Sequence, residues 1–235
     1  MNKFNIITTY YNNKDLLLKF IDGFNHHKQT YDFLKLYIID DGSQEYPAES
    51  FLVQQKDVHL YKVTEDLGFN SHGCRNLGMT VSDKDWNLLI DSDFDLKSLN
   101  LTMIVEWPME ETDVVDLSIN SLFIHKNAFW SCKGYDEEYV NQHCGDRTLL
   151  NYFKENFNYE QWPTNITNAG YNRQGRKIVF TDVDITTYDD KNLILYSPKH
   201  IQEGHAELTA AIVGRYNEKT FANKKTLCFP WTKVW

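Results

Sequence analysis

The sequence predicts an α/β fold in which a mostly parallel sheet is covered by helices on both faces. Strand-like and helix-like segments alternate along the first hundred residues, and the strand-like segments are almost continuously apolar. A strand that is apolar along its whole length is what a sheet buried on both faces requires. At 235 residues the chain is long enough for one large α/β domain, or for a core domain with an appended C-terminal segment.

The first half of the chain predicts elements in the order β-α-β-β-α-β. The first helix is expected because apolar residues recur at helical spacing, and the second because Ser71 is a suitable N-cap. The strands are short apolar runs, the first of which is rich in residues that favour strands. We expect strands at 4–9, 34–39, 58–63 and 86–90, and helices at 14–27 and 71–81.

After residue 95 the pattern is less regular. Residues 114–124 are apolar enough for a further strand, and 177–185 for another. Cys144-Gly145-Asp146 is expected to open a helix that reaches about Asn156.

Composition excludes several partners. A net charge of -9 argues against a nucleic-acid binder and against an anionic membrane surface, because both need clustered Lys and Arg. The four cysteines lack C-x-x-C spacing, which favours free thiols in a reducing compartment. The first apolar run is too short for a signal peptide, and none approaches the roughly 20 residues that span a bilayer. We therefore expect a cytoplasmic protein, with peripheral membrane attachment left open.

Polar side chains follow three of the predicted strands. In open parallel sheets ligands bind beyond the carboxyl ends of the strands, so these side chains are expected to converge on one site. They are Thr8 and Tyr10 after the first strand, Asp40-Asp41 after the second, and Asp91-Ser92-Asp93 after the fourth.

The Asp91-Ser92-Asp93 segment is the candidate metal site. On an extended backbone, residues two apart point to the same side, so both carboxylates would face one cation. Oxygen ligands of this kind suit Mn²⁺ or Mg²⁺. A solvated Asp-rich turn is the simpler explanation of D-x-D alone, but the position directly after a buried strand favours the site.

Two further segments border this predicted site. Asp40-Asp41-Gly42-Ser43 is a good turn by itself, although an Asp at a strand end also accepts hydrogen bonds from a base or ribose. The Gly-rich segment 66–78 opens the second helix, whose free amides and Arg75 favour an anion. Close helix–sheet packing is the structural alternative for Gly73 and Gly78, and a surface salt bridge is that for Arg75.

In chain order these residues resemble the family-2-like GT-A glycosyltransferases. The resemblance covers about residues 4–150 and rests on TYYN, IIDDGS, DLGFNSHGCRNLGM, NLLIDSD and FIHKNAFWSCKGYDEEY…CGDRTLL taken together. It implies that Asp41, with Asp40, contacts the nucleotide base, that Arg75 borders the donor site, and that Asp91 and Asp93 hold the metal and ribose. Thr8, Tyr10 and Ser92 complete the expected donor site.

The resemblance also implies a general base for an inverting transfer. Asp146 is the best match, but this chain has Gly145-Asp146 where many relatives carry Glu-Asp or Asp-Asp, and Asp146 is also a sound helix N-cap. Asp136 and Glu137 are similar to the family's Gly-Phe-Asp-Glu element and are expected on the acceptor side. A late histidine often completes the metal shell in such enzymes, for which His200 or His205 is suitable.

The expected reaction moves a monosaccharide from a nucleoside-diphosphate sugar, UDP- or GDP-linked, to a hydroxyl of a glycan, lipid-linked or other acceptor. The expected organisation is a nucleotide-sugar half at 1–97, an acceptor half of the same domain at 98–187, and a C-terminal segment at 188–235 that serves as a lid, an acceptor contact or an oligomer contact. A retaining enzyme and a non-catalytic nucleotide-sugar or carbohydrate-binding module remain alternatives. A nucleotidyltransferase is disfavoured because no Gly-rich basic loop follows the first strand.

Overall fold

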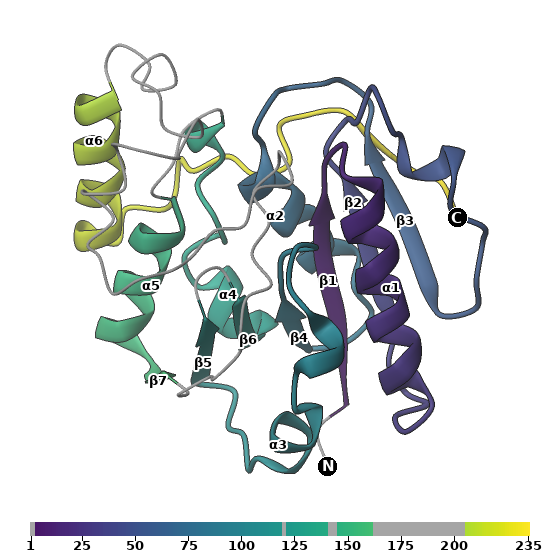
Figure 1. Cartoon of the computed structure of the whole chain (residues 1–235). Coiled ribbons are helices and arrows are strands. Elements are labelled where there is room, and N and C mark those ends of the chain that lie inside the picture. Colours follow the sequence, from purple (N-terminus) through teal and green to yellow (C-terminus); the bar gives the residue numbers. More distant parts are fainter. Residues whose placement is uncertain (1–2, 119–120, 141–144, 162–204) are drawn as a thin grey trace, which may run out of the picture.

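The computed structural model describes residues 3–118, 121–140, 145–161 and 205–235. These residues form an eight-stranded, mostly parallel sheet in the order β7-β5-β6-β4-β1-β2-β3-β8, flanked by helices (Figure 1). The strands are β1 (Phe4–Tyr10), β2 (Leu36–Asp40), β3 (Val58–Val63), β4 (Trp86–Leu89), β5 (Asp113–Ser118), β6 (Ser121–His125), β7 (Asn158–Gln161) and β8 (Trp231–Lys233). The helices are α1 (Lys14–Lys28), α2 (Ser71–Val81), α3 (Leu101–Glu106), α4 (Lys126–Trp130), α5 (Gly145–Asn156) and α6 (His205–Glu218), with short 3-10 turns at Ala48–Ser50, Leu96–Ser98 and Glu137–Tyr139.

The six elements predicted for the first half are all present, and the fold class is confirmed. Strand β1 pairs in parallel with β2 and β4, and β2 pairs in parallel with β3. Successive residues of β1 enter opposite cores: Ile6 packs with the residues of α1, and Ile7 packs with those of α2. Both are at most 1% exposed, as a sheet covered on both faces requires.

Helix α2 lies unusually close to the sheet. A Cβ atom on Gly78 would be 2.2 Å from Ile7 Cγ2, so only glycine allows this approach. A Cβ on Gly73 would instead be 2.5 Å from the ring of Phe229 and from the side chain of Asn70. Close packing against the sheet therefore explains Gly78, whereas Gly73 makes room for a residue near the C-terminus.

The strand predicted over 114–124 is wrong as a single element. It is an antiparallel pair, β5 and β6, in which Ser118 is paired with Ser121. The sequence between them contains no glycine, so the common Asn-Gly or Asp-Gly hairpin signal was missing, and apolar runs stand on both sides of the short polar sequence Ser118-Ile119-Asn120-Ser121. The strand predicted over 177–185 lies outside the described residues.

The C-terminal strap, which we define as residues 219–235, was not predicted. It leaves α6, crosses the amino end of α2, and adds β8 antiparallel to β3 at one edge of the sheet (Figure 1, yellow). Residues of the last predicted segment thus complete the sheet begun by the first half. The proposed division at residues 97 and 187 stays a prediction.

None of the helices in the described residues is both long and apolar enough to cross a membrane.

Candidate functional site

The carboxyl ends of β1 and β2 lie side by side because the two strands are paired in register. Thr8 is opposite Ile38 and Tyr10 is opposite Asp40. Thr8 and Tyr10 are each 1% exposed. The Tyr10 hydroxyl donates to the Tyr46 carbonyl at 2.6 Å, and burial beside Asp40 raises the pKa of the Tyr10 phenol. Tyr10 therefore fixes the loop after β2; that it also contacts a donor stays a prediction.

Asp40 and Asp41 are adjacent but do different things. Asp40 is fully buried, and its carboxylate accepts from the amides of Ser43 at 2.9 Å and Ala48 at 2.8 Å. Burial raises the pKa of Asp40, although these amides oppose the shift. Asp41 Oδ2 accepts from the Asn70 amide at 2.9 Å, which joins the end of β2 to the start of α2. The turn explanation therefore holds for Asp40, and a contact of Asp41 with the nucleotide stays a prediction.

The acidic segment after β4 is a turn. The Phe94 amide donates to the Asp91 carbonyl at 3.1 Å, and Asp91, Ser92 and Asp93 are all partly exposed. The expectation that an extended backbone aligns the two carboxylates is therefore wrong, because the strand ends at Leu89 and the chain folds back directly. The turn nevertheless presents both acids at the carboxyl edge of the sheet, next to β1.

Arg75 joins this turn to the predicted base. Its side chain is only 3% exposed, its Nη2 donates to Asp91 Oδ1 at 2.6 Å, and its Nη1 donates to Asp146 Oδ1. Nη1 also donates to the Tyr135 hydroxyl at 3.2 Å, and the guanidinium carbon lies 5.3 Å from the centre of the Tyr135 ring. The two carboxylates hold the pKa of Arg75 well above its ordinary value. The surface-salt-bridge alternative for Arg75 is therefore wrong.

Asp146 is the second residue of α5, whose bounds are Gly145–Asn156, so it lies inside the first turn and not at the N-cap. Its Oδ1 is bound by Arg75, and its Oδ2 lies 3.5 Å from His72 Nε2. Arg75 holds the pKa of the Asp146 carboxyl well below its usual range, against the opposing effect of burial. The group is thus ionised, in the form that accepts a proton.

Three residues of this cluster were not predicted: His72, Asn76 and Tyr135. His72 and Asn76 lie in α2 beside Arg75, and Asn76 exchanges hydrogen bonds with the backbone of Tyr135, at 2.9 Å from its amide and 3.0 Å to its carbonyl. The sequence held a signal for His72, because residues 72 and 75 are three apart and share one face of a helix. Nothing local indicated that Tyr135 would meet them.

The predicted acceptor-side acids are both bonded within the protein. Asp136 is 3% exposed and its Oδ2 lies 3.4 Å from Arg215 Nη2 in α6. The Glu137 carboxylate accepts from Asn76 Nδ2 at 2.9 Å and from two strap amides, Leu227 at 2.8 Å and Cys228 at 3.1 Å. These contacts attach α6 and the strap to the site; a role toward an acceptor stays a prediction.

The metal ligands are described in part. His200 lies outside the described residues, and His205 begins α6 with its side chain outside the described part. Among the described side chains, no three His, Cys, Asp or Glu residues form a metal-holding group. Asp91 and Asp93 supply two carboxylates, which suit Mn²⁺ or Mg²⁺ when substrate phosphates and water provide the remaining ligands. The two carboxylates therefore fit such an ion, and His205 as a third ligand stays a prediction.

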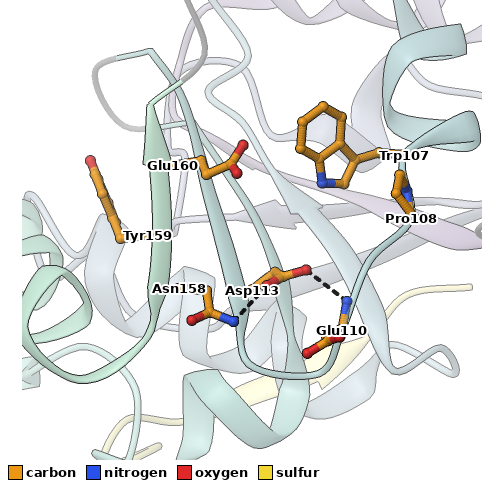
Figure 2. Close-up of a pocket in the computed structure, with 7 residues that line it drawn as sticks. All are labelled: Trp107, Pro108, Glu110, Asp113, Asn158, Tyr159 and Glu160. Atoms are coloured by element: carbon orange, nitrogen blue, oxygen red, sulfur yellow. Dashed lines mark hydrogen bonds between the residues drawn. The ribbon is translucent and has the colours of Figure 1, made fainter.

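A separate hollow of about 480 Å³ lies at the other end of the sheet (Figure 2). It is lined at the amino ends of β5 and β7, where Asp113 accepts from the Glu110 amide at 2.7 Å and from Asn158 Nδ2 at 3.2 Å. Strands β4 and β5 run in the same direction, since each is antiparallel to β6. This hollow is therefore distinct from the edge that carries Asp91.

Comparison with known proteins identifies the fold. Among solved structures, the chain is similar to mannosyltransferase PcManGT from Pyrobaculum calidifontis in complex with GDP-Man and Mn²⁺ (TM-score 0.54, 14% identity, 68% of this chain and 55% of that one). It is also similar to S. aureus TarS 1-349 in complex with UDP-GlcNAc (TM-score 0.53, 10% identity, 69% and 59%). The fold is that of the GT-A glycosyltransferases, and the chain spans a little over half the length of these two.

The family is shown by sequence. The family model for glycosyl transferase family 2 matches residues 5–184, which is most of the chain. The chain belongs to glycosyl transferase family 2. No curated protein matches it.

Proposed function

We propose that this chain binds a nucleoside-diphosphate sugar with a divalent metal and transfers the sugar to a hydroxyl acceptor with inversion, Asp146 being the base. The observation that carries the proposal is the buried Arg75, which holds Asp91 and Asp146 on its two terminal nitrogens. One guanidinium thus fixes the spacing between the predicted metal turn and the predicted base. Donors of the proposed type are bound by the two similar structures, as GDP-Man with Mn²⁺ and as UDP-GlcNAc.

The donor side is assigned to the carboxyl edge of β1, β2 and β4. Asp41 would accept from the base or ribose, and Asp91 with Asp93 would hold Mn²⁺ or Mg²⁺. Such an ion, when bound, neutralises the charge that develops on a departing diphosphate. Arg75 adds a fixed positive charge beside the same turn and keeps Asp91 oriented.

The acceptor side is assigned to Asp146. As the acceptor oxygen bonds to the anomeric carbon, the bond from that carbon to the diphosphate oxygen breaks, and the hydroxyl proton passes to the Asp146 carboxylate. Because Arg75 lowers the pKa of Asp146, the carboxylate is ionised at every physiological pH but is a weak base. We therefore expect the proton to move late, once the bond to the anomeric carbon has made the hydroxyl acidic.

The same ion pair favours a second candidate, a module that binds a nucleotide sugar without turnover. A carboxylate committed to Arg75 can be structural alone, and in that case its replacement would change stability and not catalysis. Retention of configuration is a further alternative, which the stereochemistry of the product separates from inversion.

Two variants test the proposal. Asp93→Ala is expected to abolish the Mn²⁺-dependent part of donor binding in calorimetry, with Asp95→Ala, an acid two residues further on, as the matched control. Asp146→Asn is expected to keep donor binding within about twofold and to lower transfer by about 100-fold or more, the usual contribution of a general base. Unchanged donor affinity of Asp93→Ala counts against the metal assignment. Wild-type binding with no turnover on a broad acceptor panel favours the module.

A further inference from the structure

His72 is a buried histidine that faces the predicted base. It is the second residue of α2, is 1% exposed, and is surrounded by aromatic rings. The ring centres of Phe69, Tyr135 and Tyr139 lie 6.2, 5.2 and 6.0 Å from the centre of the imidazole. Within the part of the chain that the structure describes, neither ring nitrogen has a hydrogen-bond partner. A polar group buried in this way is costly unless a partner lies within reach.

The partner within reach is Asp146. His72 Nε2 lies 3.5 Å from Asp146 Oδ2, slightly beyond a formed hydrogen bond, whereas the other carboxylate oxygen is bound by Arg75. His72 and Arg75 are three residues apart in α2, so one helix face presents a donor to each oxygen. Catalytic hydrogen bonds are often long in the absence of substrate and shorten when it binds.

Gly145 makes this approach possible. A Cβ atom at position 145 would lie 2.5 Å from His72 Nε2 and 2.6 Å from Cε1, distances that real Cβ atoms do not show. The imidazole therefore occupies the space in which any other side chain at position 145 would begin. Glycine at position 145 leaves the room that the His72 ring occupies, and this places the ring next to the Asp146 carboxylate.

We propose that His72 is a positioning residue for Asp146, donating from Nε2–H to Oδ2 while Arg75 holds Oδ1. The Asp146 side chain is 23% exposed and the His72 side chain is 2% exposed. The carboxylate is therefore accessible to a substrate, whereas the imidazole contacts it from the protein interior. With one oxygen held, a carboxylate still turns about its last torsion; with both held, its plane is fixed. The catalytic part of this inference rests on the proposed function of Asp146.

The hydrogen bond is tested without any substrate. In ¹⁵N-edited spectra of the full chain, with the His72 signals assigned by their loss in His72→Phe, we expect a protonated Nε2 that shifts on Asp146→Asn. Gly145→Ala is expected to perturb the same signals and lower Tm, and His72→Ala in the same chain is expected to recover part of that Tm. A His72 protonated only at Nδ1, or signals that ignore Asp146→Asn, overturns the hydrogen bond.

The positioning role is tested by kinetics. His72→Phe keeps the shape of the aromatic surroundings without a donor, and His72→Gln keeps a donor near the position of Nε2. We expect His72→Phe to lower kcat by about 10- to 100-fold, the usual effect of losing an orienting partner, with donor KM within about twofold. His72→Gln is expected to recover most of the loss. A kcat of His72→Phe equal to that of the wild type, or a loss that Gln does not rescue in a folded variant, overturns the role.

Different outcomes would overturn the proposed function and the positioning role of His72. A wild type that binds donor and transfers no sugar overturns the proposed function and the catalytic role of His72 together, while the spectra still decide the hydrogen bond. An active wild type with a fully active His72→Phe overturns the positioning role alone.

Discussion

Replacement of Arg75 by methionine is the most informative perturbation of this protein. Arg75 is buried and is held by Asp91 and Asp146, so Arg75→Met leaves two carboxylates without their shared cation. Breaking a buried ion pair from one side costs about 3 to 5 kcal/mol. Because the Asp91 and Asp146 side chains are 32% and 23% exposed, water can solvate them in part, and we expect the lower end, about 3 kcal/mol.

The assay is urea unfolding followed by circular dichroism, with a thermal scan as the second measurement. For a chain of this size, about 3 kcal/mol corresponds to a fall in Tm of roughly 6 to 12 °C. The matched control is Lys97→Met, since Lys97 lies 3.5 Å from Asp22 and both side chains are more than half exposed. Surface pairs of that kind contribute little, so the control is expected to stay within about 0.5 kcal/mol of the wild type.

The stabilisation that the Arg75–Asp146 ion pair contributes is expected to depend on pH. Arg75 lowers the pKa of Asp146 in the folded protein, so the stabilisation is fully present above the unfolded value of about 3.9 and is lost as pH falls toward the lowered folded value. The unfolded state is the same for both proteins, so the difference in stability between wild type and Arg75→Met is expected to shrink as pH falls, starting where the Asp146 carboxyl of Arg75→Met, whose pKa burial raises without the guanidinium, takes up a proton. An Arg75→Met protein as stable as Lys97→Met at pH 7 would refute the reasoning.

Three further predictions follow from the packing. Lys224 is 4% exposed and its ammonium donates to the carbonyls of Cys132 and Gly134; burial lowers its pKa to about 8. Burying the charged ammonium lowers the stability of the folded protein below pH 8, and this cost disappears as the group loses its proton at higher pH. The free energy of unfolding of the wild type, measured by urea unfolding, should therefore rise by about 2 kcal/mol relative to Lys224→Met between pH 7 and 9.5. A flat difference contradicts this. Gly78→Ala should lower stability by about 1 to 3 kcal/mol because its Cβ meets Ile7. Gly214→Ala in α6, where the new Cβ has no neighbour within 4 Å, should raise stability by about 0.5 to 1 kcal/mol. Stability changes of the same sign in the two variants would refute the packing argument. Glu137→Ala should expose the Leu227 and Cys228 amides to faster hydrogen exchange and cost about 1 to 3 kcal/mol, and unchanged exchange would show that Glu137 does not hold the strap.

The order of elements was predictable because the signals that define each element are local. Apolar spacing within α1 and the continuous apolar runs of β1 and β4 are properties of short segments, and each appears in the structure where it was expected. The rule that ligands bind beyond the carboxyl ends of parallel strands indicated the edge of the sheet at which the candidate residues lie, and ligand binding at that edge stays a prediction. The break between β5 and β6 escaped prediction because its local signal, Ser118-Ile119-Asn120-Ser121, is short and lacks the glycine that usually marks a hairpin.

The division of labour among the acidic residues was not predictable. Asp40 and Asp41 are neighbours in the same turn sequence, yet the fold commits Asp40 to the amides of Ser43 and Ala48 and aims Asp41 at the start of α2. Either carboxylate could have closed the turn, and the direction of a side chain at a strand end depends on the pairing of that strand with its neighbours.

The sequence by itself determined the fold class, the family and the edge of the sheet at which Asp91, Asp93 and Asp41 gather. Only the tertiary structure decided that Arg75 is buried between Asp91 and Asp146, that His72 faces Asp146 across Gly145, and that the strap closes over α2. The physical reason is range. Helix and strand signals act within one segment, whereas residues 75, 91 and 146 meet because α2 packs on β1 and β2 and the first turn of α5 reaches the side chains of α2. From the sequence alone an arginine is expected at the surface, and only the fold shows that Arg75 is shielded from water and bound by two carboxylates.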